Sequence, residues 1–121
     1  MTPSRATATA ARRALDVRAE KPASQRGMTP IGIRRATQLA NRQTVSLDTA
    51  KRMVSYFTRH LVDKKGSTWG EQGKGWQAWM GWGGDPGARQ AIALVRQEDR
   101  EWFDRWRQGV RAQALLRHLG R

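Results

Sequence analysis

A capping residue followed directly by a proline occurs twice in this chain, at Thr29-Pro30 and at Asp85-Pro86. Threonine and aspartate side chains accept hydrogen bonds from the free amides at a helix start, and a proline in the first turn lacks only an amide that has no helical partner. The two pairs therefore predict helices that begin at residues 30 and 86. Gly83-Gly84, just before the second pair, provides the left-handed backbone at which a preceding helix ends.

Apolar spacing predicts the helices of the amino-terminal half. An apolar residue recurs every three or four positions along residues 47–61, which predicts an amphipathic helix that Ser46 caps. The helix that starts at residue 30 precedes it after a short turn. The alanine-rich segment 4–20 predicts a further helix with a thin apolar face, and the proline and glycine within residues 21–27 predict a linker.

The carboxy-terminal half is predicted in the same way. Residues 62–75 are polar and contain several glycines, which predicts a mobile loop. Residues 76–82 place two tryptophans and a methionine on one side of a short helical segment. An apolar stripe then continues over residues 86–119 and predicts one long helix, with an interruption at Gly109 as the alternative.

These elements predict an all-α fold of about four to five helices with a helix-turn-helix-like pair and a tryptophan-rich core. Only 38% of the residues are hydrophobic, against about 45–50% in typical globular proteins, so we expect one end of the chain to be extended or peripheral. The predicted organisation is a basic helical arm with a linker, residues 1–27, and a helical domain, residues 28–121. The domain comprises a helix pair at 30–61, the loop at 62–75, the tryptophan helix at 76–82 and the long helix at 86–119.

Positive charge is concentrated in the first half of the chain. The chain has 23 lysines and arginines against 10 aspartates and glutamates, a net charge of +13. Residues 1–66 hold 14 of the basic and 4 of the acidic side chains, a net charge of +10. Such clusters typically bind nucleic acid, because phosphate contacts release counterions, although solubility or an anionic protein partner would also account for them. The predicted phosphate contacts are Arg12, Arg13, Arg34, Arg35, Lys51, Arg52, Lys64 and Lys65.

Residues 36–53 resemble the helix-turn-helix of bacterial repressors, in which the first turns of the second helix enter the DNA major groove. The turn departs from that motif because it lacks glycine and because Leu47 occupies a position that is often exposed. A regulator of this kind would read DNA sequence and dimerise through the carboxy-terminal helix. A basic helical hairpin that contacts only phosphates gives the same pattern, so both interpretations stay open. The groove-facing side chains would be Asp48, Thr49, Lys51 and Arg52.

Six tryptophans are unusual in a chain of 121 residues. Exposed indoles stack on bases in single-strand binding proteins, whereas buried indoles form a core. The helical spacing of Trp79, Trp102 and Trp106 favours the core. Trp69 lies in the glycine-rich loop, where we expect it to be exposed and able to anchor a protein partner. The predicted protein-docking residues are Trp69, Leu115, Leu116 and Leu119.

The sequence offers little for catalysis or metal binding. It has no cysteine, which excludes disulfides and thiolate metal sites, and only two histidines. His60 and Asp63 could supply two metal ligands, but a third is not evident. Residues 81–87 are rich in glycine yet lack the lysine-serine end of a phosphate-binding loop. We therefore expect no enzyme activity, no metal and no cofactor.

Membrane insertion and export have no sequence support. The chain contains no run of about 18 apolar residues and no apolar secretory signal. We therefore expect no membrane partner and no secretion through a signal peptide.

The block from residue 29 to residue 87 contains a series of short motifs. They are Thr29-Pro30-Ile31-Gly32-Ile33, Arg35-Ala36, Leu39-Ala40-Asn41, Arg52-Met53, Phe57, Arg59-His60, Val62-Asp63-Lys64-Lys65 and Ala78-Trp79-Met80-Gly81-Trp82-Gly83-Gly84-Asp85-Pro86-Gly87. This block resembles a small domain of unassigned function that recurs in tailed phages, including phages of cyanobacteria, alone or joined to head-maturation and other virion proteins. That domain usually has alanine at the position of Pro86. The resemblance implies a phage origin and a place in or near the head, and it carries over no catalytic residue.

The sequence therefore predicts a non-enzymatic, basic phage protein that is associated with the virion head and contacts the DNA backbone. The expected location is the virion or the host cytoplasm. Two alternatives stay open: a sequence-specific DNA-binding regulator, and a capsid or portal adaptor or decoration protein that does not touch DNA.

Overall fold

The computed structural model describes residues 1–120, and in that range the protein is all-helical, as predicted, with no strand. The α-helices are α1 (Arg5–Glu20), α2 (Pro30–Ala40), α3 (Leu47–His60), α4 (Lys74–Gly81), α5 (Gly84–Glu98), α6 (Arg100–Trp106) and α7 (Val110–Leu119). Short 3-10 helices in the connections are η1 (Ala23–Gln25), η2 (Leu61–Lys65) and η3 (Trp69–Glu71). Within residues 1–120 no helix is both long enough and apolar enough to span a membrane.

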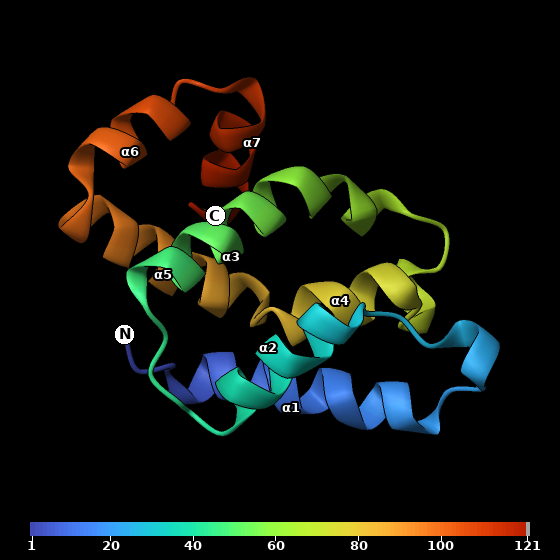
Figure 1. Ribbon diagram of the computed structural model, residues 1–121. Coiled ribbons are helices and arrows are strands. Elements are labelled where there is room, and N and C mark those ends of the chain that lie inside the picture. Colours follow the sequence, from blue (N-terminus) through green and yellow to red (C-terminus); the bar gives the residue numbers. More distant parts are fainter. Residues whose placement is uncertain (121) are drawn as a thin grey trace.

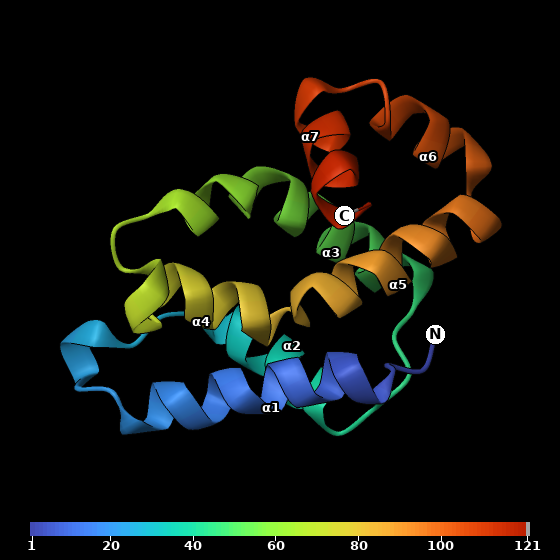
Figure 2. The same cartoon turned by 180° about the vertical axis from the view of Figure 1, so that it is seen from behind.

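The helices are arranged around a central pair, α3 and α5, which pack closely on each other (Figures 1 and 2). On one side of this pair α1 packs along α2 and α4 and reaches α5. On the other side α6 follows α5 and turns the chain back, so that α7 packs on α3. The core therefore receives side chains from both halves of the sequence.

The first helix is part of the packed structure, which corrects the expectation of a peripheral end. The face of α1 toward the other helices consists of small residues, and Ala11 and Ala14 are fully buried. Small side chains let helix backbones approach closely, so a thin apolar face is sufficient here. Two long-range hydrogen bonds fix its start: the Ser4 amide and the Thr7 hydroxyl each donate to Oε1 of Gln90, at 2.8 Å.

Two of the three predicted caps are confirmed. The side chains of Thr29 and Ser46 accept hydrogen bonds from the amides of the residues three positions on, and Pro30 opens α2. Asp85 is not a cap, because α5 already begins at Gly84. Gly83 and Gly84 have φ angles of 110° and 63°, in the left-handed region that favours glycine. This backbone joins α4 to α5 directly and leaves the Asp85 carboxylate available for other contacts.

The prediction of one long helix over residues 86–119 is wrong, because the chain breaks twice. Asp99 leaves the helical conformation, with φ −144° and ψ 76°, and its carboxylate caps α6 by accepting from the Trp102 amide. Gly109 is extended and precedes α7, so the alternative of an interruption there is confirmed. Apolar spacing continues through both breaks, and therefore it could not show where the helix ends.

Residues 62–75 are more ordered than the predicted loop. They contain most of η2 and all of η3, and α4 begins at Lys74, two residues earlier than expected. Gly73 lets the chain close here, because a Cβ atom at this position would lie 2.3 Å from the Thr68 hydroxyl oxygen. Its amide donates to the Thr68 carbonyl at 2.9 Å. Gly73 therefore serves a tight turn.

The predicted tryptophan-rich core is confirmed. The Trp79 side chain is 1% exposed, and its ring meets that of Phe57 edge-on, with 4.8 Å between the centroids. Trp76 is also buried. Trp102 and Trp106 are half-buried and stack on each other at the edge of the core.

Asp85 connects four elements through its carboxylate. Oδ1 accepts from the Trp79 indole at 2.9 Å and lies 3.1 Å from Nζ of Lys64, while Oδ2 lies 3.0 Å from Nε2 of His118. Burial alone would raise the pKa of Asp85, but the hydrogen bond and charge of Lys64, with help from Trp79 and His118, lower it below its ordinary value. The carboxylate thus stays ionised and holds α4, α5, η2 and α7 together.

We predict that acid destabilises the protein through Asp85. Since the folded-state pKa lies below the value of about 3.9 in an unfolded chain, the carboxylate contributes its full stabilisation above that value. This contribution is lost as the pH falls through the folded-state pKa. Thermal unfolding can be followed by circular dichroism from about pH 6 to about pH 2. The melting temperature should fall over this range, and it should fall less in Asp85→Asn than in the unmodified chain. Glu98→Gln, on an exposed side chain, is the control, and identical pH profiles for Asp85→Asn and the unmodified chain would contradict the prediction.

Candidate nucleic-acid interface

The outer face of α3 carries two exposed arginines. Arg52 and Arg59 lie opposite the buried stripe of this helix, seven residues apart, which is about two turns and roughly 10 Å. Neither forms an ion pair with a carboxylate of residues 1–120. Ser55 lies between them on the same face, and Asp48 lies at its beginning.

Arg34 and Arg35 of α2 extend this positive surface at one end. The pKa of Arg35 is lowered by burial and also by the positive charges of Arg52 and Arg34, so the three guanidinium groups lie within electrostatic range of one another. Arg35 donates to the side chain of Gln38, and its buried Nε has no hydrogen-bond partner within residues 1–120. Three mutually repelling cations without a carboxylate favour the approach of an anion.

Lys65 and Arg111 extend the surface at the other end. Together with Arg59 they line a hollow of about 340 Å³ between η2, α3 and α7. None of the residues that line this hollow is acidic. We call the whole surface the α3 cation band, and it consists of Arg34, Arg35, Arg52, Arg59, Lys65 and Arg111.

A column of stacked side chains supports the band from beneath. Tyr56 stacks between His60 and Trp82, with ring centroids 4.6 Å and 4.8 Å away, and the Arg35 guanidinium lies 5.8 Å from the Trp82 centroid. The column joins α2, α3 and α4. Both faces of the Tyr56 ring are occupied within the protein, so this ring is not a platform for nucleic-acid bases. The column therefore positions Arg35.

The structure removes two lysines from the predicted phosphate contacts. Lys51 forms an ion pair with Asp99, with 2.6 Å between Nζ and Oδ2, and Lys64 forms one with Asp85. Both lysine side chains are mostly buried, and they help to hold α5 against its neighbours. The partners come from distant parts of the sequence, so the pairing has no local signal.

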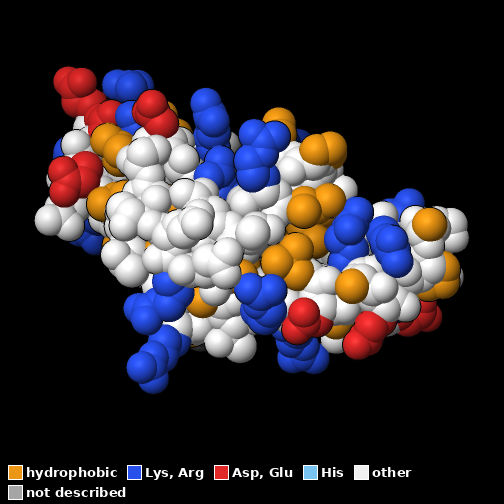
Figure 3. Space-filling view, turned by 60° about the horizontal axis from the view of Figure 1, so that its bottom comes forward, with side chains coloured by type: hydrophobic (Ala, Val, Ile, Leu, Met, Phe, Trp, Pro, Cys, Tyr) orange, Lys and Arg blue, Asp and Glu red, His pale blue; other side chains and the backbone are white. Residues whose placement is uncertain are grey.

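Arg12 and Arg13 remain exposed but belong to a separate group on α1. They line a shallow hollow together with Asp16 and Ala40. Arg12 donates to the Asn41 side chain at 3.3 Å. Figure 3 views the molecule from its α1 and α2 side and shows lysines and arginines across the middle of this face, with acidic side chains toward two opposite edges. The positive charge is thus spread over more than one surface.

The two helices that resemble a helix-turn-helix are present, but their packing differs from that motif. α2 packs on α1 and α4, whereas α3 packs on α5 and α7. In a helix-turn-helix protein the first helix crosses the DNA backbone beside the recognition helix. Here the Thr49 hydroxyl accepts from Ser46, and Lys51 is paired. Of the four predicted groove-facing residues, only Asp48 and Arg52 are exposed.

The predicted protein-docking residues are mostly inside the molecule, which corrects that prediction. Leu115 is fully buried, Leu119 is nearly so, and Leu116 is half-buried. Trp69 is half-buried against Trp79, because η3 folds over α4. The leucine spacing identified an apolar face, and α7 uses this face to pack on α3.

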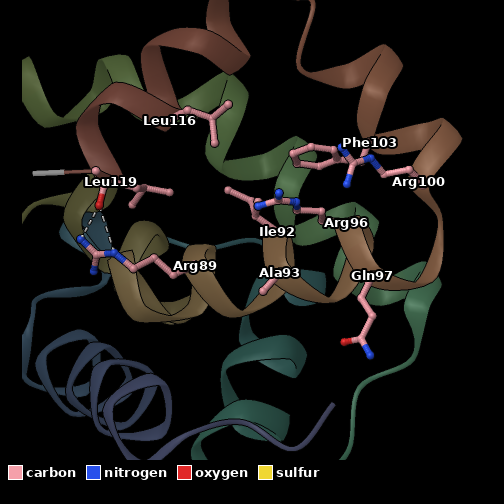
Figure 4. A pocket seen from close by; sticks show the side chains of 10 residues that line it. Arg89, Ile92, Ala93, Arg96, Gln97, Arg100, Phe103, Leu116 and Leu119 are labelled. Atoms are coloured by element: carbon pink, nitrogen blue, oxygen red, sulfur yellow. Dashed lines mark hydrogen bonds between the residues drawn. The ribbon is translucent and has the colours of Figure 1, made fainter.

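A hollow of about 530 Å³ remains between α5, α6 and α7 (Figure 4). Ile92, Phe103 and Leu116 point toward its interior, and arginines lie at its rim. Arg89 is already engaged, since its guanidinium donates twice to the Leu119 carbonyl, at 3.2 and 2.9 Å. One of the rim cations is therefore committed to the end of α7.

Sequence reasoning missed Arg59 and Arg111 as site residues. Arg59 lies on the polar face of a correctly predicted helix, so its exposure could have been inferred. Arg111 follows Arg59 by about fifty residues and joins it only through the packing of α7 on α3. Nothing near Arg111 in the sequence indicates that contact.

The described residues show no metal centre. No group of three histidine, aspartate or glutamate side chains within residues 1–120 could hold a metal ion. His60 and Asp63 are hydrogen-bonded to each other, with 3.0 Å between Nδ1 and Oδ2. Comparisons with protein-family models, curated proteins and solved structures give no match to this chain.

Proposed function

We propose that this protein binds DNA through phosphate contacts made by the α3 cation band. The observation that carries the proposal is that α3 carries a group of three cations at each end of its outer face. Arg34, Arg35 and Arg52 form one group and Arg59, Lys65 and Arg111 the other, and none of the six forms an ion pair with a carboxylate of residues 1–120. By contrast, Lys51 and Lys64 are neutralised by Asp99 and Asp85. A surface without such neutralisation fits an extended anion.

The resemblance of residues 29–87 to a phage domain supplies the proposed setting. In that setting the protein is associated with the virion head, where packaged DNA is the abundant polyanion, and it has no enzymatic role. Mass spectrometry of purified virions tests this part of the proposal. Absence of the chain from particles that contain all other head proteins would remove the setting but leave DNA binding open.

DNA binding by the band should depend steeply on salt and little on sequence. We predict that Arg52→Gln combined with Arg59→Gln makes the slope of log affinity against log salt shallower by about two, because each phosphate contact contributes about 0.9. The loss of affinity should be similar for two duplexes of unrelated sequence. Fluorescence anisotropy with labelled duplexes from about 50 to about 200 mM salt measures both quantities.

The matched control removes the same charge elsewhere. Arg5 and Arg117 are exposed on α1 and α7, outside the band, so Arg5→Gln combined with Arg117→Gln should leave the slope nearly unchanged. Equal changes in the two double variants would show that net charge, not the band, binds DNA. A salt-independent affinity of the unmodified chain would overturn the proposed function.

A further inference from the structure

A second cavity of about 530 Å³ adjoins the α3 cation band at Arg59. It lies where the connection at residues 26–29, the end of α3 and the start of α4 meet. Its charged and polar lining consists mainly of Arg26, Tyr56, Arg59, His60, Asp63 and Lys74. Neither the predicted phosphate contacts nor the band includes Lys74, which α4 brings to this place.

The lining has an excess of positive charge. Three cations face one carboxylate, that of Asp63, so the net charge of the lining is +2 with His60 neutral. The Asp63 carboxylate is already hydrogen-bonded to His60. Arg59 and Lys74 are exposed, and neither pairs with a carboxylate of residues 1–120. The cavity therefore has two cations that are available to a ligand.

The wall of the cavity is held in a fixed shape. Gln77 is fully buried; it accepts from the Gly27 amide at 2.7 Å and donates to the carbonyls of Gln25 and Gln72 at 3.1 and 3.0 Å. A Cβ atom at residue 27 would lie 2.7 Å from the Lys74 carbonyl oxygen, so only glycine fits. Met28 then adopts a left-handed backbone with φ 71°. Ligand binding does not have to order this segment.

Tyr56 adds a donor without an acceptor to the same wall. The side chain is only 6% exposed, and its buried hydroxyl has no hydrogen-bond partner within residues 1–120. Protein atoms cover the hydroxyl oxygen itself, so an acceptor in the cavity reaches it only after the side chains around it shift. Burial, together with the nearby negative charge of Asp63, raises the pKa of Tyr56, so the hydroxyl stays protonated and can only gain from an acceptor.

We propose that this cavity binds a phosphomonoester, such as the terminal phosphate of a DNA strand. A phosphomonoester carries a charge of about −1.5 to −2 at neutral pH and has three acceptor oxygens, whereas a backbone phosphodiester carries only −1. The lining charge of +2, with Arg59 and Lys74 unpaired, matches the monoester. The inference rests on the proposed function, since Arg59 belongs to both the cavity and the band and lets a strand end continue along α3. The phosphomonoester could also come from a free nucleotide, which carries the same group.

The test compares two duplexes of identical sequence, one with 5′-phosphates and one with 5′-hydroxyls. Anisotropy should show at least about tenfold tighter binding of the phosphorylated duplex, the size expected for one hydrogen bond to a charged group. Adenosine monophosphate should compete with the phosphorylated duplex and not with the hydroxyl duplex. Binding of adenosine monophosphate alone, measured by calorimetry, identifies free nucleotide as a further source of the ligand.

Two variants separate this cavity from the band. Lys74→Gln should abolish the preference for the 5′-phosphate and leave the affinity for the hydroxyl duplex nearly unchanged. Lys65 belongs to the band and lies outside the cavity. Lys65→Gln should therefore weaken the binding of both duplexes and keep the preference for the 5′-phosphate. Equal affinities of the unmodified chain for both duplexes, with the steep salt dependence intact, would overturn the phosphate site alone. If neither duplex binds, the proposed function fails; calorimetric binding of adenosine monophosphate that Lys74→Gln removes would then still support the cavity.

Discussion

Trp79→Ala is expected to lower the free energy of unfolding by about 3–5 kcal/mol, as for other buried aromatic residues truncated to alanine. The Trp79 ring is enclosed by aromatic neighbours from α3 and η3, so the cavity left behind cannot collapse easily. The substitution also removes the indole donor from Asp85. Since domains of this size are stable by only about 5–15 kcal/mol, the variant should be close to unfolding at physiological temperature.

Urea denaturation followed by far-ultraviolet circular dichroism measures this effect. Trp79→Phe keeps most of the ring volume and removes the hydrogen bond to Asp85, so it should fold and lose less stability. The matched control is Trp102→Ala, because Trp102 is half-buried, and its expected loss is about 1 kcal/mol. A larger loss for Trp102→Ala than for Trp79→Ala would contradict the central position of Trp79.

Gln77→Met should lower the free energy of unfolding by about 1–3 kcal/mol, because the buried Gly27 amide would lose its only acceptor. This figure covers the Gly27 amide alone. Methionine has a similar length and shape, so the variant isolates the hydrogen bonds from the loss of volume. The connection at residues 26–29 should loosen as well, and with it the wall of the phosphomonoester cavity. We therefore expect the preference for a 5′-phosphate to decrease in this variant.

Urea denaturation and amide hydrogen exchange of Gly27 check this prediction together. The Gly27 amide should exchange far faster in Gln77→Met than in the unmodified chain. Gln97→Met on the exposed side of α5 is the control and should change stability by less than about 0.5 kcal/mol. An unchanged midpoint and unchanged exchange in Gln77→Met would show that the buried amide side chain does not hold the connection.

Local signals in the sequence were sufficient to predict the helices up to residue 60. Pro30 and the cap Ser46 act on the backbone within one turn, so the sequence alone shows where α2 and α3 begin. The break at Asp99 does have a local cap, since the Asp99 carboxylate accepts from the Trp102 amide, but the apolar spacing continues through it and hides it. The ion pair of the same carboxylate with Lys51, 48 residues earlier, has no local signal.

The same limit applies to the candidate site. Lys51 and Arg52 are adjacent in the sequence and equally basic, yet α3 turns one toward Asp99 and the other toward solvent. Helical periodicity separates their directions but does not show which direction meets a carboxylate. The cavity at Lys74 was entirely unforeseen, because it is formed by a connection, the end of one helix and the start of another.

The hydrogen bonds from Ser4 and Thr7 to Gln90 impose an order of events during synthesis. α1 leaves the ribosome well before α5, and Gln90 follows the end of α1 by 70 residues. At translation rates of ~5–20 residues per second this interval lasts roughly 4–14 seconds. An isolated alanine-rich helix of this length is only marginally formed in water. During this interval α1 can pack only on α2 and then on α4, and the hydrogen bonds that fix its start form only once α5 has emerged.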